Sequence, residues 1–365
     1  MKICYLAAAN SIHSYRWIKF FAERGHDVHW ISLVQNQYDR LENVHCYEYP
    51  VRSAVSIDFI RTAFAVRRLI RDIAPDILHA HYAGTYGLVG AISGFHPFIV
   101  TAWGSDVLLG SRSFFKKPFV QHVLRKADLI TCDADHMKEA MLRLGVPSSK
   151  IQVVYFGIDT KKFRPAERTD ILRKKYGTSS APVIMSLRNL EPIYNVESLV
   201  KAVPKVLKAF PKAQFLIAGT GSEDARLRSL SESLGITRNV KFIGRYPNSE
   251  LAQYLNAVDI YVSTSLSDAG IAASTAEAMA CGVPVVITDS GENRKWVTDD
   301  KDGFVVPVRS PDILAERIVM LLQDGILRKQ FGERGSAIIS KRNDYYKEME
   351  KTENLYRDIL HARKN

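Results

Sequence analysis

The stretch "DIYVSTSLSDAGIAASTAEAMACGVPVVITD", from Asp259 to Asp289, has the pattern of one complete strand–helix–strand unit. Its ends, DIYVSTS and VPVVITD, are short β-branched runs of the kind that form buried strands. Between them we expect a loop over residues 266–272 and a helix over residues 274–280. Strands that alternate with helices in this way pair in parallel. The stretch therefore predicts an α/β fold with a parallel sheet.

The same alternation extends through both halves of the chain. The strand candidates are KICYLAAA, DVHWISL, DILHAHY, FIVTAWG, DLITC and IQVVYFGI in the first half, and PVIMSLRN, QFLIAGT, VKFIGRY, DIYVSTS, VPVVITD and FVVPV in the second. Helical patterns lie between them, for example at residues 15–24, 59–73, 195–210 and 311–323. We therefore expect two Rossmann-like, doubly wound parallel-sheet domains, with ligands bound in a cleft at the carboxyl ends of the strands.

A break at residues 156–182 separates the two halves. It is charged, contains prolines and has no strand pattern, so we interpret it as the linker. The first domain is expected at residues 1–165 and the second at residues 166–343. A C-terminal helix at residues 344–365 is expected to return to the first domain.

Composition and charge limit the classes of function. The chain has 365 residues, and its 46% hydrophobic and 24% charged residues are ordinary for a globular protein. No apolar run reaches the roughly 20 residues of a membrane helix, and the start MKICYLAAANS lacks a signal peptide's long apolar core. We therefore expect a cytoplasmic location.

The net charge of +11 predicts anionic partners, but no nucleic-acid-binding motif is recognisable, so phosphorylated ligands or an anionic membrane are favoured.

Cysteine and histidine spacing gives no sign of a metal centre. Cys4, Cys46, Cys132 and Cys281 are scattered and form no CxxC motif, which favours small reduced residues packed in apolar surroundings. The histidines do not stand at ligand spacing with these cysteines. We expect neither a metal nor another cofactor.

Candidate ligand-binding residues of the second half follow its strands. Arg188 stands at the end of PVIMSLRN, and a guanidinium can bind phosphate with two hydrogen bonds. Gly219 and Gly221, in AGTGSEDARL, can bring backbone N–H groups close to a phosphate or a sugar. The structural alternatives are a surface arginine in a turn and ordinary turn glycines.

Glu277 is the one glutamate of the opening stretch. We place it on the first turn of the 274–280 helix, where Ser274 and Thr275 can cap the N-terminus and the dipole stabilises a carboxylate. That position is a routine one for glutamate. Its apolar neighbours suggest burial, however, and a buried carboxylate needs partners such as a ligand's diol. The nearest other acid is Asp268.

These residues lie in motifs that resemble a known family. The run EAMACGVPVV, which begins at Glu277, resembles the donor-site signature of the GT4 family of retaining glycosyltransferases, which have the GT-B fold. The segments VVYFGIDTKKFRP, FLIAGTGSEDARL, VKFIGRYPNSELAQYLNAVDIYVSTS and DGFVVPVRSPDILAERI resemble further segments of that family. The resemblance is strong over residues 153–323 and looser in the first domain. It implies that the first domain binds the acceptor and the second the donor.

The resemblance also implies an activity and residue roles. We expect a hexosyl unit to pass from a nucleotide-diphosphate sugar, a UDP-sugar before a GDP-sugar, to a glycan or lipid-linked acceptor, with no metal. Glu277 would bind the ribose, Arg188 the leaving diphosphate, and Asp106 would orient the transferred sugar; we take these three as catalytic. The implied donor-binding residues are Arg188, Gly219, Gly221, Gly244, Arg245, Asp268, Gly270, Ile271, Ala272 and Glu277.

Three positions depart from the family pattern. The first of two family glutamates would fall at Ala269, a phosphate-binding lysine at Tyr194 or Ile193, and a histidine at Trp103. Because of these changes, the resemblance does not identify the donor. They also leave two rival functions, a non-catalytic nucleotide-sugar-binding protein and a sugar-nucleotide epimerase or hydrolase.

Acceptor-binding residues are expected after strands of the first domain. The candidates are Asn10, His13, Arg16, His81 and Trp103. His13 is alternatively a plain helix-start residue, and of His79 and His81 one is expected to be packed. Trp103 either stacks on a sugar or fills the wall of the cleft.

Residues 111–126, SRSFFKKPFVQHVLRK, resemble the basic and aromatic surface with which some relatives touch membranes. Phe115, Phe119 and Val123 recur at helical spacing among lysines and arginines. The alternative is an ordinary helix that buries this apolar stripe.

Overall fold

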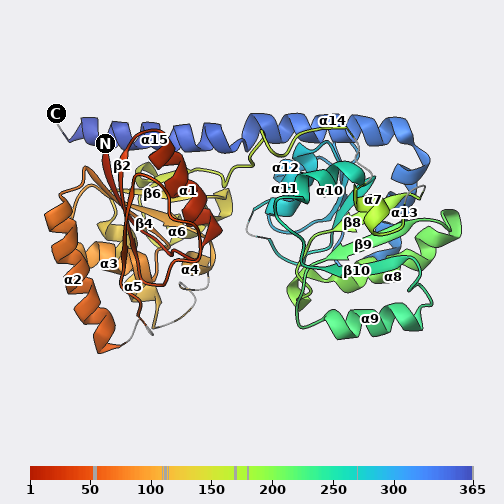
Figure 1. Ribbon diagram of the computed structural model, residues 1–365, viewed down its shortest axis with the longest axis horizontal. Coiled ribbons are helices and arrows are strands. Elements are labelled where there is room, and N and C mark those ends of the chain that lie inside the picture. The colour runs from red at the N-terminus through yellow and green to blue at the C-terminus, as the bar shows by residue number, and fades with distance from the viewer. Residues whose placement is uncertain are drawn as a thin grey trace. The chain divides into compact units, whose positions relative to one another are not determined.

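The computed structural model describes residues 1–51, 56–108, 110, 113, 115–167, 171–178, 181–268 and 270–363. It divides into two compact units, Met1–Phe156 with Lys347–Asn365, and Gly157–Tyr346 (Figure 1). The sequence placed this boundary at residue 165. Gly157 lies against Tyr345. Its φ is +77°, and a Cβ at this position would lie only 2.5 Å from the Tyr345 Cα, which explains why glycine stands there.

The first unit is built on a seven-stranded parallel sheet in the order β3-β2-β1-β4-β5-β6-β7. Its strands are β1 Lys2–Leu6, β2 Asp27–Ser32, β3 Val44–Glu48, β4 Ile77–His81, β5 Phe98–Ala102, β6 Leu129–Cys132 and β7 Ile151–Val153. Its helices are α1 Ile12–Glu23, α2 Ile57–Ile73, α3 Thr85–Ser93, α4 Ser105–Leu108, α5 Lys117–Lys126, α6 Asp135–Arg143 and most of α15 Tyr345–Ala362, with the short 3-10 turn η2 Ser148–Lys150. The edge strand β3 was not expected from the sequence.

Helix α2 shows how the sequence sets this packing. Ser56 Oγ accepts the backbone N–H of Phe59 at 3.2 Å and caps the helix start. The helix then buries Phe59, Ala63, Val66, Ile70 and Ile73, which share one face by their spacing. That face joins the same core as alternate residues of β1. The central strands β4 and β5 are buried along their whole length, as parallel strands covered on both faces must be.

The last helix of the chain returns to the first unit. The ring of Tyr356 stacks on that of Phe21, with 5.1 Å between centroids, and its hydroxyl bonds Nδ1 of His79. Glu353, which is 3% exposed, pairs with Arg24 at 2.7 Å and with His26 at 3.2 Å. The final helix therefore completes one face of a sheet whose strands come from the other end of the chain.

The second unit has a six-stranded parallel sheet in the order β10-β9-β8-β11-β12-β13. Its strands are β8 Val183–Ser186, β9 Gln214–Ala218, β10 Val240–Gly244, β11 Ile260–Ser263, β12 Val285–Thr288 and β13 Phe304–Val306. Its helices are α7 Ile171–Lys175, α8 Val196–Ala209, α9 Asp224–Ser233, α10 Leu251–Ala257, α11 Ala273–Ala280, α12 Asn293–Trp296, α13 Pro311–Gln323 and α14 Gly325–Arg342, with the 3-10 turn η3 Pro192–Tyr194. The expected pair of doubly wound parallel-sheet domains is thus confirmed.

Each sheet has one switch point, where the strand order reverses. It lies between β1 and β4 in the first unit and between β8 and β11 in the second. Ligands of doubly wound folds bind beside such points, at the carboxyl ends of the strands. Within the described part of the chain, no helix combines the length and the apolar character that crossing a membrane requires.

Candidate functional site

The switch point of the second unit carries a buried ion pair. Arg188 follows β8, Asp268 follows the neighbouring strand β11, and Nη2 of Arg188 donates to Oδ1 of Asp268 at 2.5 Å. The two side chains are only 12% and 7% exposed. Burial raises the pKa of Asp268, while the positive charge of Arg188 opposes that rise. The sequence named both residues, and the structure brings them together.

The guanidinium of Arg188 is also held by an aromatic ring. Its Cζ lies 4.3 Å from the centroid of Tyr194, which with Ile193 is one of the two positions where the family's lysine would fall. Thr264 Oγ1 fixes the turn by donating to the Tyr194 carbonyl at 3.0 Å. Nε of Arg188 is buried and has no hydrogen-bond partner among the described residues. The ring of Tyr194 thus supports the guanidinium from its face.

The glycines after β9 allow two loops to pack closely. A Cβ on Gly219 would lie 2.4 Å from the Arg188 carbonyl oxygen, and one on Gly221 would lie 2.2 Å from that of Leu190. Ser222 donates to Glu191 through its backbone N–H at 3.0 Å and its hydroxyl at 2.6 Å. These glycines therefore set the position of the Arg188 loop. Their expected contact with the donor stays a prediction.

Helix α11 differs from its expected form at the N-terminus. It begins at Ala273, with Ala272 as an N-cap that has no side-chain hydrogen bond. Ser274 does not cap it, because its hydroxyl lies 2.7 Å from that of Tyr261 in the core. Glu277 lies in the second turn rather than the first, and it is half-buried. The helix dipole thus stabilises its carboxylate less than the sequence suggested.

Tyr246 is a residue of this site that the sequence analysis missed. Burial raises its pKa, the charge of Glu277 raises it further, and that of Arg188 lowers it. Both predicted donor-binding side chains therefore act electrostatically on Tyr246, which is half-buried. Its position directly after Gly244 and Arg245, which the sequence did single out, was the available signal. Gly244 accepts the N–H of Gly219 at 2.8 Å, while Arg245 is exposed.

The loop between β11 and α11 is supported from the next strand. A Cβ on Gly291 would lie 2.1 Å from the Asp268 carbonyl oxygen, so this glycine is needed for the close approach. Gly270 and Ile271 are half-buried and Ala272 is buried. Ala269, where the family has a glutamate, lies outside the described residues.

In the first unit, three of the predicted acceptor-binding residues share an aromatic cluster. The ring of His13 stacks on Trp103, with 5.4 Å between centroids and 25° between planes. It also meets the edge of Phe156 at 4.3 Å, and Cζ of Arg16 lies 4.8 Å from the same ring. Phe156 was missed from the sequence, although it follows β7. Asn10, which shortly precedes His13 in the sequence, is exposed.

Two histidines near this cluster are held neutral. Desolvation and the charge of Arg16 lower the pKa of His13 to about 4. Burial lowers the pKa of His81 to about 3. His81 is only 1% exposed and its Nδ1 lies 3.2 Å from the Ser14 hydroxyl, so it lies under the cluster rather than on the surface. Both His79 and His81 are packed, where the sequence expected one.

Asp106 is engaged by backbone groups. It is 3% exposed, and its carboxylate accepts the N–H groups of Ala83 at 2.7 Å, Trp103 at 3.1 Å and Val107 at 3.0 Å. These bonds anchor the turn that presents Trp103. The structure therefore supports a positioning role, and the expected contact with a transferred sugar stays a prediction.

Comparisons with known proteins agree with this architecture. Residues 168–337 match the family described as glycosyl transferases group 1, and residues 2–134 match the family described as glycosyl transferase 4-like. A GDP-mannose-dependent monoacylated alpha-(1-6)-phosphatidylinositol monomannoside mannosyltransferase of Corynebacterium glutamicum is 31% identical, over 82% of this chain and 80% of its own. The N-acetyl-alpha-D-glucosaminyl L-malate synthase of Bacillus anthracis is 25% identical over 95% of this chain and 93% of its own.

A solved glycosyltransferase structure from Rickettsia africae superposes with a TM-score of 0.86 at 19% identity, and covers 98% of both chains. Fold and comparisons together define a glycosyltransferase with two Rossmann-like units, the GT-B fold. The chain belongs to the GT4 family. The family, fold and enzyme class predicted from the sequence are thereby confirmed.

Proposed function

We propose that the enzyme transfers a hexosyl unit from a nucleotide-diphosphate sugar to a hydroxyl group of a glycan or lipid-linked acceptor. The observation that carries the donor assignment is Arg188, a buried cation at the switch point of the second sheet. We keep a UDP-sugar as the expected donor. The Corynebacterium relative, whose name specifies GDP-mannose, favours a GDP-sugar as the alternative.

In this proposal the donor lies across the loops that follow β8, β9, β10 and β11. Arg188 and the free N–H groups at the start of α11 take the diphosphate, because cations and helix N-termini stabilise developing negative charge. Glu277 accepts hydrogen bonds from the ribose hydroxyls. These groups supply the charge stabilisation that a leaving diphosphate needs, and we expect no metal in the transfer.

We further propose transfer with retention of configuration at the anomeric carbon. The bond between that carbon and the diphosphate oxygen breaks, and the diphosphate leaves with the electron pair. The acceptor hydroxyl attacks from the same face, and its proton passes to the departing phosphate. His13, Arg16 and Trp103 are the proposed acceptor contacts, with His81 and Asp106 supporting them from beneath.

Thermal-shift screening against UDP-, GDP- and ADP-sugars tests the donor, because a ligand that binds only the native state raises its apparent stability. We expect one nucleotide class to raise the melting temperature, and Glu277→Ala to reduce the shift. If no member of the panel binds, the proposed function fails. Release of free sugar or an epimer without acceptor would instead establish the hydrolase or epimerase alternative.

We also propose that residues 111–126 touch an anionic membrane surface on the cytoplasmic side. Helix α5 buries Val123, but Phe115 and Phe119 are 80% and 58% exposed beside Lys116 and Lys117. Exposed aromatics next to cations suit the lipid interface. Cosedimentation with anionic vesicles should fall for Phe119→Ser and not for Ile326→Ser, a matched change at a 73% exposed residue of the second unit. Equal sedimentation of both variants would refute this surface.

A further inference from the structure

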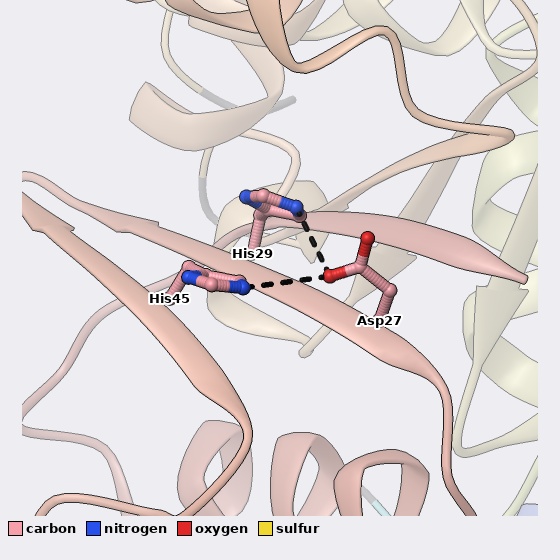
Figure 2. Close-up of side chains that lie close together, drawn as sticks. All are labelled: Asp27, His29 and His45. Atoms are coloured by element: carbon pink, nitrogen blue, oxygen red, sulfur yellow. Dashed lines mark ion pairs between the residues drawn. The ribbon is translucent and has the colours of Figure 1, made fainter.

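The edge of the first sheet brings together an aspartate and two histidines. In β2, Asp27 and His29 are two residues apart and so point to the same face of the strand. The register of β2 with the edge strand β3 places His45 directly beside His29. Figure 2 shows both imidazole rings directed at one oxygen of the Asp27 carboxylate.

The distances between these groups are close to those around a metal ion. Nε2 of His29 lies 3.2 Å and Nε2 of His45 lies 3.7 Å from Oδ1 of Asp27. One ligand atom from each of the three residues lies within 4.8 Å of the others. In a tetrahedral site with bonds of about 2.0–2.1 Å, ligand atoms stand about 3.3 Å apart. A small rotation of the exposed His45 ring would complete this spacing.

His29 is placed as metal-ligating histidines usually are. It is 8% exposed, and its Nε2 makes no hydrogen bond of good geometry with the described residues although it faces Asp27. Its other nitrogen, Nδ1, lies 3.2 Å from the Tyr47 hydroxyl. A hydrogen bond at Nδ1 fixes the ring and leaves Nε2 to bind a metal. The ring of His45 stacks on that of His29, with 4.7 Å between centroids.

We propose that Asp27, His29 and His45 bind one divalent transition-metal ion, with Zn²⁺ as the expected occupant. Imidazole ligands favour zinc, copper and nickel, whereas magnesium and calcium favour oxygen ligands alone. The side chains of Asp27 and His45 are 45% and 61% exposed, which gives the ion a path from solvent and leaves room for water as a further ligand.

This site would act on the fold rather than on sugar transfer. Its residues lie in the amino-terminal halves of β2 and β3, whereas the candidate acceptor residues follow the carboxyl ends of the strands. An ion shared by β2 and β3 would fasten the edge strand of the sheet. We expected no metal from the sequence, because the spacing of the histidines was considered only relative to the cysteines. The edge strand β3, which places His45 beside His29, was not predicted.

Zinc titration of the full-length, chelator-treated protein without a histidine tag tests the proposal. We expect calorimetry to show saturation at one ion per chain, with a rise in melting temperature. His45→Ala and Asp27→Asn should each raise the dissociation constant at least about tenfold, and Tyr47→Phe should raise it by about tenfold through His29. His361→Ala, at an exposed histidine far along the chain, should bind as the native protein does.

Co²⁺ provides a second measurement, because its visible absorption reports a low-symmetry nitrogen and oxygen site. The band should appear with the native protein and be absent for His45→Ala. Since His45 is exposed on an edge strand, that variant should fold, and circular dichroism in chelator checks that it does. Absence of saturable zinc binding, or Asp27 and His45 variants that bind zinc as tightly as the native protein, overturns the proposal. Neither outcome bears on nucleotide-sugar binding in the second unit.

Discussion

Arg188 and Asp268 are 80 residues apart in the chain and are joined by a 2.5 Å hydrogen bond at the switch point of the second sheet. The arginine proposed to bind the donor diphosphate therefore also has an acidic partner within its own unit. Asp268 thus balances the charge of Arg188 and fixes its direction, while Tyr194 supports the guanidinium from its face.

This pair should be energetically coupled. Asp268→Asn and Arg188→Met should each destabilise the fold, because each leaves a buried group without its charged partner. We expect the double variant to lose less than the sum, with a coupling energy of about 1–3 kcal/mol in urea unfolding. Strict additivity would show that the observed hydrogen bond contributes nothing to stability.

The kinetic role of Arg188 gives a separate prediction. If Arg188 stabilises the leaving diphosphate, Arg188→Ala should lower kcat by about 100-fold to 1,000-fold, the usual cost of losing a donor to developing charge. Donor KM should change much less. Arg188→Lys should restore part of kcat, since it keeps the charge without the planar fork. Equal losses in kcat and in donor binding would contradict the leaving-group role.

The role proposed for Glu277 can be tested on the donor as well as on the protein. Glu277→Ala should weaken donor binding by about 1–3 kcal/mol, the value of charged hydrogen bonds. A nucleotide sugar with a deoxygenated ribose should bind the native enzyme less tightly, and the Glu277→Ala variant should not distinguish it from the normal donor. Calorimetry measures all four combinations. A variant that still distinguishes the two donors would place the ribose elsewhere.

Stability should depend on pH through the two buried histidines of β4. The pKa of His79 lies well below its ordinary value and that of His81 is lowered to about 3. The unfolded chain therefore binds protons below about pH 6.5 that the folded chain refuses, and the free energy of unfolding falls as pH falls. Each histidine contributes about 1.4 kcal/mol per pH unit in that range.

Urea unfolding at pH 7.5, 6.5 and 5.5 measures this slope. His81→Gln should reduce the slope of unfolding free energy against pH by the contribution of one proton, about 1.4 kcal/mol per pH unit, because its amide does not titrate. His122→Gln, at an exposed histidine, should leave it unchanged. A slope that is the same in both variants and in the native protein would exclude His81 as its source.

The sequence predicted most of the fold because its parallel strands are buried on both faces and so appear as continuous apolar runs. It failed at β3, VHCYE, which is only partly buried at the sheet edge and has no such run. The start of α11 was also misplaced. Ser274 and Thr275 looked like caps, but Ser274 is used by Tyr261 in the core.

The candidate site was predicted as a set of residues rather than as an arrangement. Motif position was enough to name Arg188 and Glu277, since such residues follow strands. Which side chains meet could not be predicted, because Tyr194, Tyr246 and Asp268 come from different loops whose positions depend on the strand order. For Asp106 the sequence could not show that its carboxylate accepts three backbone N–H groups.

The return of α15 sets the order in which the protein is completed during synthesis. Tyr356 and Glu353 leave the ribosome after every residue of the second unit, yet they cover His79, Arg24 and His26 of the first. The unit that is translated first is thus the one that is finished last. Until α15 has been translated, a nascent chain exposes an uncovered face of its first sheet, and a stop codon shortly before Tyr356 would leave that face exposed for good.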